Sequence, residues 1–237
     1  MRPNLKPETE QSEPSPVLPR PATWLSKWSL RRFRSARMLK VFTRIHSRNR
    51  WGSSESVSGP GSEVAATHII REALPRLIKQ HGITSLLDAP CGDFNWMQAV
   101  DLAGVSYIGG DVVQELIESV SRRYAAPNRR FVHLDLVNDP LPAVDLIFCR
   151  DCFLHLPDKL IHRALANFRR CGARFVMLST FADTRINNDT HVGGFHAVNL
   201  CAAPFNLPPP MELIPEQQPA EPGAFYKCMG LWSTRVL

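Results

Sequence analysis

The stretch LLDAPCGDF, residues 86–94, decides the fold of this 237-residue chain. It completes an apolar run from Ile83 to Asp88, which is short enough to indicate a buried strand. The turn after the run contains Pro90 and Gly92, two residues that end regular structure. A strand that ends in an acid followed by a tight turn is typical of the edge at which a parallel sheet builds a ligand site.

Strands and helices alternate along the chain on both sides of this stretch. Helices are predicted at 62–74, 94–102, 112–124 and 157–170, and further strands at 105–110, 130–134, 144–149 and 174–179. Pro75 should kink or divide the first helix. Two closing strands, 211–215 and 225–236, have no helix between them and predict an antiparallel hairpin. The pattern predicts a doubly wound α/β domain with seven strands, most of them parallel.

Carboxylates follow each of the first four predicted strands. Asp88, Asp111 and Asp135 follow the first three, and Arg150-Asp151 follows the fourth, with His155 shortly after. Because parallel strands end at one edge of a sheet, these side chains should converge on one crevice. A dinucleotide site needs several glycines to admit a pyrophosphate, and only Gly92 is present. S-adenosylmethionine offers an ammonium, a ribose diol and an adenine amino group, which suit carboxylates, and it carries no phosphate.

These motifs resemble those of the class I S-adenosylmethionine-dependent methyltransferases. LLDAPCGDF is similar to their first motif, although Pro90 and Phe94 stand where glycines are usual. LIFCRDCFLHLP, residues 146–157, is similar to their strand-four motif. WGSSESVSGPGS, residues 51–62, is similar to an upstream segment of a bacterial group. The resemblance implies a Rossmann-like methyltransferase fold over residues 51–237 and S-adenosylmethionine as co-substrate.

The resemblance also implies which residues bind and react. A metal-dependent reaction on a catechol-like diol, with Asp151, Asp183 and Asn187 nearby, is the lesser alternative, because the sequence has no metal-ligand spacing. A hydroxyl acceptor requires a base, for which a histidine of near-neutral pKa is suited. Asp111 could instead cap a helix, Asp135 could form an ordinary turn, and His155 could be a structural histidine. The catalytic candidates are His155, His191 and Asp151, and the cofactor-binding candidates are Asp88, Pro90, Cys91, Gly92, Asp93, Phe94, Trp96, Asp111, Val112, Asp135, Leu136 and Arg150.

The long irregular stretch after the fifth strand is the predicted acceptor region. Residues 183–207 are too many for an ordinary connection, and they carry apolar anchors and the Gly193-Gly194 pair. We expect them to form the acceptor pocket and its lid. The predicted function is methylation, most simply O-methylation, of a small-molecule or sugar acceptor. The alternatives are a non-catalytic cofactor-binding module and a nucleotide-dependent oxidoreductase.

Charge is distributed unevenly along the chain. Residues 1–50 hold 12 Lys/Arg and 3 Asp/Glu, whereas the remainder has a net charge of −3, which disfavours a nucleic-acid partner. Six prolines within residues 1–21 predict a disordered leader over 1–23. Residues 24–50 are basic and amphipathic, suited either to contact an anionic membrane or a partner, or to pack on the domain. The six cysteines form no zinc pattern, which favours reduced thiols and a cytoplasmic protein.

Overall fold

The sheet is built around two strands that are almost wholly buried. The computed structural model describes residues 36–216 and 226–237. Within them β1, Ser85–Asp88, has three buried residues, and β4, Leu146–Cys149, is buried at all four. The two strands pair in parallel, with Asp88 opposite Phe148. Strands covered on both faces belong to the interior of a parallel sheet, as the apolar runs predict.

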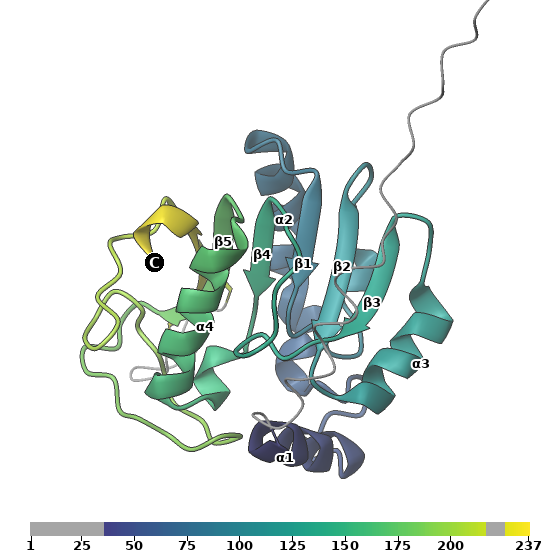
Figure 1. Ribbon diagram of the computed structural model, residues 1–237, viewed down its shortest axis with the longest axis horizontal. Coiled ribbons are helices and arrows are strands. Elements are labelled where there is room, and N and C mark those ends of the chain that lie inside the picture. Colours follow the sequence, from purple (N-terminus) through teal and green to yellow (C-terminus); the bar gives the residue numbers. More distant parts are fainter. Residues whose placement is uncertain (1–35, 217–225) are drawn as a thin grey trace, which may run out of the picture. The chain divides into compact units, whose positions relative to one another are not determined.

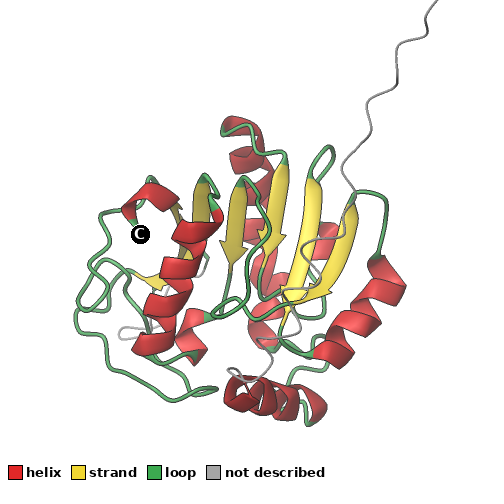
Figure 2. Ribbon diagram, viewed as in Figure 1, coloured by secondary structure: helices red, strands yellow, loops and turns green. Residues whose placement is uncertain are grey.

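The sheet has seven strands in the order β3-β2-β1-β4-β5-β7-β6 (Figures 1 and 2). Strands β1 to β5 run parallel, whereas β7 is antiparallel to both β5 and β6. The winding direction reverses between β1 and β4, which places a crevice at their carboxyl ends. The seven-stranded, mostly parallel sheet and its antiparallel C-terminal pair are therefore confirmed. The remaining strands are β2, Ser106–Asp111; β3, Arg129–His133; β5, Phe175–Phe181; β6, Glu212–Pro215; and β7, Lys227–Ser233.

Helices cover both faces of the sheet. Helices α2, His68–Gln80, and α3, Gln114–Tyr124, contribute Leu74 and Ile117 to one apolar core cluster. Helix α4, Asp158–Cys171, lies in front of the sheet in Figure 1, and α2 lies behind it. Among the described residues, no helix is both long and apolar enough to cross a membrane.

Two helix predictions differ from the structure. Pro75 lies inside α2 without dividing it, because the helix buries Leu74 and Leu77 on either side of the proline. No α-helix forms over residues 94–102, where Met97–Ala99 makes only a single 3-10 turn. Phe94 has a φ of 61°, a left-handed conformation that cannot belong to an α-helix.

A further helix lies across the carboxyl ends of the parallel strands. This is α1, Ala36–Ser47 (Figure 1). Met38 and Ile45 are buried against the domain, while Lys40 and Arg44 face solvent. Over these residues the basic amphipathic segment is thus a helix packed on the domain. The rest of that segment and the predicted disordered leader lie outside the described residues.

Candidate functional site

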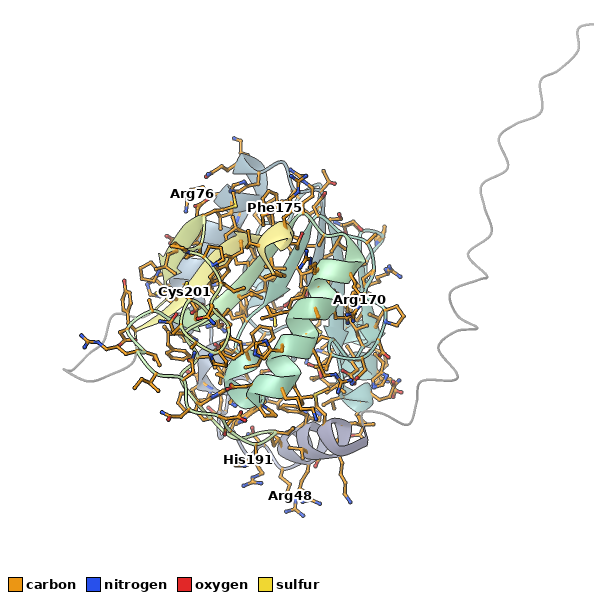
Figure 3. All side chains as sticks on the ribbon, turned by 60° about the vertical axis from the view of Figure 1, so that its left-hand side comes forward. Arg48, Arg76, Arg170, Phe175, His191 and Cys201 are labelled. Atoms are coloured by element: carbon orange, nitrogen blue, oxygen red, sulfur yellow. The ribbon has the colours of Figure 1, made fainter. Side chains whose placement is uncertain are left out.

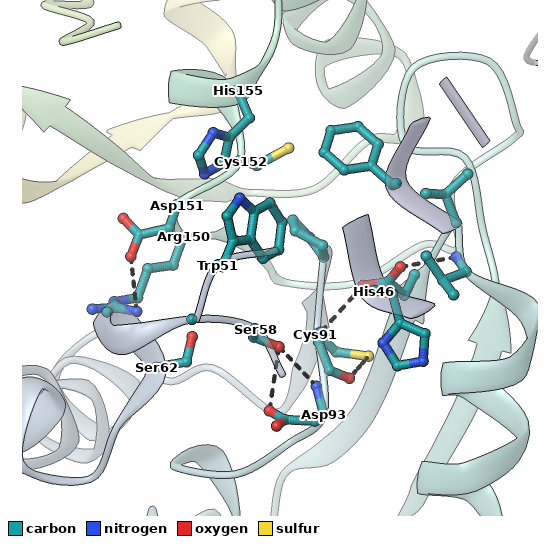
Figure 4. A pocket seen from close by; sticks show the side chains of 18 of the residues that line it. His46, Trp51, Ser58, Ser62, Cys91, Asp93, Arg150, Asp151, Cys152 and His155 are labelled. Atoms are coloured by element: carbon teal, nitrogen blue, oxygen red, sulfur yellow. Dashed lines mark hydrogen bonds and ion pairs between the residues drawn. The ribbon is translucent and has the colours of Figure 1, made fainter. Parts of the chain in front are cut away.

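A cavity of about 570 Å³ lies at the carboxyl ends of β1, β2 and β4 (Figure 4). This is the crevice on which the carboxylates that follow the strands were expected to converge. The structure brings 12 of the predicted site residues into its lining. They are Asp88, Pro90, Cys91, Gly92, Asp93, Trp96, Asp111, Val112, Leu136, Arg150, Asp151 and His155.

Asp88 ends β1 at the floor of the cavity. Its Oδ2 accepts a hydrogen bond of 2.6 Å from the Tyr107 hydroxyl, and the carboxyl group is buried. Burial raises the pKa of Asp88 to about 7, and this effect outweighs the hydrogen bond from Tyr107. The nearby Arg150 charge offsets only part of the cost of burying this carboxylate, so Asp88 is a natural partner for a positively charged ligand group.

Asp111 ends β2 and links two loops of the cavity wall. Its Oδ1 accepts from the Val113 amide at 2.9 Å, and its Oδ2 accepts from the Gly92 amide at 3.3 Å. Burial raises the pKa of Asp111. A carboxylate has about four acceptor positions, so these two bonds leave Asp111 able to accept from a ligand.

Asp93 fastens the segment 51–62 to the loop after β1. Its carboxylate accepts from the Ser56 hydroxyl at 3.0 and 2.9 Å, from the Val57 amide at 3.0 Å and from the Ser58 hydroxyl at 3.3 Å. Gly92 permits this approach: its φ is 54°, and a Cβ there would lie 2.2 Å from Ser58 Oγ. Residues 57–62 consequently form one wall of the cavity.

Four charged residues form a network in which Arg150, Glu216 and Lys227 are buried and Asp151 is half-buried. Arg150 Nε donates to Glu216 at 2.6 Å, and its Nη1 lies 3.1 Å from Asp151. Lys227 Nζ lies 2.9 Å from Asp151 and 3.3 Å from Glu216. Burial alone would raise the pKa of Asp151, but the two cations lower it to about 2. Asp151 is therefore a fixed anion and a poor proton acceptor.

One nitrogen of the Arg150 guanidinium, Nη2, takes no part in this network. Its Nη2 is buried and has no hydrogen-bond partner among the described residues. The guanidinium lies 5.4 Å from the centre of the Trp96 ring and lines the cavity close to Asp88. A buried donor normally has a partner, so Nη2 is suited to bind an acidic ligand group.

His155 is held by the loop after β5. Its Nδ1 lies 2.7 Å from the Gly194 carbonyl oxygen, and its own carbonyl accepts from the Gly193 amide at 2.9 Å. Because a carbonyl only accepts, Nδ1 carries the proton and Nε2 presents a lone pair. Burial lowers the pKa of His155, which favours this neutral form.

Three predicted residues are not among those that line the cavity. Phe94 packs edge-on against Tyr107 and Phe131 in the core. The Asp135 carboxylate accepts from the backbone of Val137 and Asn138, which are the bonds of an ordinary turn. His191 is exposed at the end of the molecule near α1 (Figure 3).

The cavity also contains residues that the sequence did not single out. Helix α1 contributes Met38, Phe42 and His46, and Lys227 comes from β7. No strand-end pattern marks these positions. Trp51 lies in the segment 51–62, and its ring stacks on His155 at 5.0 Å. The resemblance of that segment to an upstream segment of a bacterial group was the available signal, but it assigned no role to Trp51.

Helix α1 and the loop after β5 meet beside the cavity. Gly193 has a φ of 80°, and a Cβ on it would lie 2.7 Å from Val41 and 3.0 Å from Ile45. Only glycine fits this contact. Phe195 of this loop and Phe181, the last residue of β5, both line the cavity. No group of three potential metal ligands occurs within the described ranges.

Comparison with known proteins agrees with this architecture. Residues 86–173 match a family model described as a methyltransferase domain. The 1,6-didemethyltoxoflavin-N1-methyltransferase of Burkholderia thailandensis, crystallised with S-adenosylhomocysteine, superposes with a TM-score of 0.60 at 14% identity, over 92% of this chain and 93% of that one. A search of curated proteins finds no match.

Two further structures share the fold. The magnesium protoporphyrin IX methyltransferase of Synechocystis PCC 6803, with bound S-adenosylmethionine, has a TM-score of 0.52 at 12% identity, over 90% of this chain and 98% of that one. The methyltransferase domain of the bacterial protein CtHen1 has a TM-score of 0.53 at 12% identity, over 71% and 99%. The chain therefore has a Rossmann-like methyltransferase fold.

Proposed function

We propose that this protein is an S-adenosylmethionine-dependent methyltransferase that methylates a hydroxyl group of a small molecule. One observation carries the proposal. Asp88, Asp111 and Nη2 of Arg150, which has no partner among the described residues, all border the cavity at the switch point of a methyltransferase fold. The sequence match over residues 86–173 supports the same activity.

The donor set fits the chemical groups of S-adenosylmethionine. Asp88 suits the ammonium and Arg150 Nη2 suits the carboxylate, so the two residues would hold the amino-acid end. Asp111 retains acceptor positions for the ribose hydroxyls. Val112, Leu134 and Leu136 offer an apolar surface for the adenine. The bound co-substrate supplies an electrophilic methyl group on a sulfonium.

The protein's own part in the reaction is to position the acceptor and to receive its proton. His155 has Nδ1 fixed on Gly194, which leaves Nε2 free to accept the hydroxyl proton. Asp151 stays ionised beside it, and its charge stabilises the imidazolium that forms.

Calorimetric titration of the full-length protein tests the first half of the proposal. S-adenosylhomocysteine should bind, and NAD should not, because the site has no glycine-rich cradle for a pyrophosphate. Binding of NAD in preference would indicate an oxidoreductase. Binding of neither ligand by folded protein would contradict the proposal.

Catalysis is tested with a labelled methyl donor and a cell extract. Transfer of label to a small molecule by the wild-type protein supports an enzyme. Donor binding without transfer to any extract component would favour the alternative of a non-catalytic cofactor-binding module.

A further inference from the structure

The acceptor end of the cavity is defined by the topology. If the proposed function holds, the co-substrate occupies the ends of β1 and β2, where Asp88 and Asp111 lie. The acceptor must then approach from the side of β4 and β5. The residues that line this side include Trp51, Leu154, His155, Phe181 and Phe195.

Aromatic rings from three separate segments gather at this end. Trp51 stacks on the His155 imidazole with centroids 5.0 Å apart and planes inclined by 22°. Phe195 approaches His155 edge-on at 6.5 Å, and Phe181 meets Phe195 edge-on at 6.3 Å. All four rings line the cavity, and Phe195 is 57% exposed, so this end offers an aromatic surface to another flat, apolar ring. We call this end of the cavity the aromatic slot.

The charged groups at this end are already engaged with each other. Lys227 Nζ binds both carboxylate oxygens of Asp151, at 3.0 and 2.9 Å, and the Ser179 hydroxyl lies 3.3 Å from the same carboxylate. A sugar would need a partner for each hydroxyl that loses water on binding. An acceptor with a single hydroxyl on an apolar body requires only one such hydrogen-bond partner.

The basicity of His155 also favours an acceptor with one acidic hydroxyl. Burial lowers the pKa of His155, so its Nε2 is a weak base. A weak base removes a proton more readily from a phenol, whose pKa is about 10, than from a hydroxyl with a pKa nearer that of water, about 15.7.

We propose that the natural acceptor is a phenol, whose ring lies among Trp51, Phe181 and Phe195 and whose hydroxyl meets Nε2 of His155. The phenol oxygen forms the new bond to the methyl carbon as the bond from that carbon to sulfur breaks. The electron pair of the broken bond stays on sulfur. The hydroxyl proton ends on Nε2.

The test is a competition among three matched probes for the full-length protein saturated with S-adenosylhomocysteine. The probes are 4-ethylphenol, 4-ethylcyclohexanol and methyl β-glucoside, and ligand-observed NMR gives each Kd. The phenol should bind at least tenfold more tightly than either competitor, a difference of about 1.4 kcal/mol. Equal or tighter binding of the cyclohexanol or the glucoside, or no binding of the phenol, would overturn the inference.

Variants of Trp51 distinguish specific binding of the phenol at the aromatic slot from nonspecific hydrophobic binding elsewhere on the protein. Trp51→Leu should remove the preference for the phenol, and Trp51→Phe should retain it, with the affinity for S-adenosylhomocysteine unchanged in both. Ile186→Ala, at a residue that is 75% exposed and outside the cavity lining, is the matched control. A preference that survives Trp51→Leu contradicts the proposed slot.

The same series separates this inference from the proposed function. If S-adenosylhomocysteine does not bind, the proposed function fails before any probe is added. If it binds and the phenol shows no preference, the methyltransferase proposal stands and the phenol assignment alone fails.

Discussion

The two ends of the cavity are built from different kinds of structure. The end near β1 and β2 takes its polar groups from strand termini, Asp88 and Asp111, whose positions follow from the hydrogen-bonded register of the sheet. The end near β4 and β5 takes its rings from loops, with Trp51 before the sheet begins and Phe195 after β5. A sheet edge fixes acids in a predictable row, whereas the aromatic slot exists only once distant segments have packed.

The largest effect that would distinguish the two ends is expected at the base. His155→Gln should reduce methyl transfer by about 10²- to 10⁴-fold, the usual contribution of a general base. The affinity for S-adenosylhomocysteine should stay within about twofold, because His155 belongs to the acceptor end. The measurement combines transfer of a labelled methyl group with calorimetry.

His191→Gln is the matched control for the base, since His191 is exposed and outside the cavity lining. Its transfer rate should stay close to that of the wild type. If the losses at the two histidines were reversed, His191 would be the base and the loop would have to close over the site.

At the cofactor end, the expected loss is in affinity. Asp111→Ala should weaken binding of S-adenosylhomocysteine by about 1.5–3 kcal/mol, since an ionised hydrogen-bond acceptor is lost. Asp135→Asn is the comparison at a neighbouring strand end. Its carboxylate serves a turn, so thermal stability should fall while Kd stays nearly constant. Equal losses of affinity would place Asp135 in the site.

The pH dependence of stability examines the cofactor end without any acceptor. The folded-state pKa of Asp88 is about 7, above its unfolded value of 3.8. The stability linked to this group is complete below the unfolded pKa and is lost as pH rises through about 7. Between about pH 6 and pH 8 the ligand-free protein should lose about 1.4 kcal/mol through Asp88.

Denaturant unfolding of the wild type and Asp88→Asn at the two pH values isolates this contribution. The variant should lack that part of the loss, while other titrating groups affect both proteins alike. Identical pH dependence in the two proteins would show that Asp88 titrates normally.

The smallest effect on stability and affinity is expected from a change outside both ends of the cavity. Residues 1–21 contain six prolines and few apolar side chains, so their deletion should change neither the melting temperature nor the affinity for S-adenosylhomocysteine. A fall of several degrees would show that this segment docks. Deleting residues 1–50 instead removes α1, and with it Met38, Phe42 and His46 from the cavity.

The sequence was informative wherever local pattern and topology determine position. The mostly parallel sheet could be expected from the alternation of elements, and the positions of Asp88, Asp111 and Arg150 at one edge of the sheet follow from it. Phe94 could not be placed in this way, because its left-handed φ and its packing on Tyr107 depend on tertiary contacts. The contribution of α1 to the cavity lining could not be predicted either. An amphipathic pattern indicates that one face of a helix is buried, but it does not indicate which part of the protein that face contacts.

The contact between Gly193 and α1 ties the position of the helix to that of the candidate base. The same turn that rests on Val41 and Ile45 also holds His155 by its ring and its carbonyl. A side chain at position 193 would overlap Val41 and strain the backbone at a φ of 80°, so the helix or the turn would have to move. A substitution that displaces the turn would therefore also disturb the tautomer of His155, from a position outside the cavity lining.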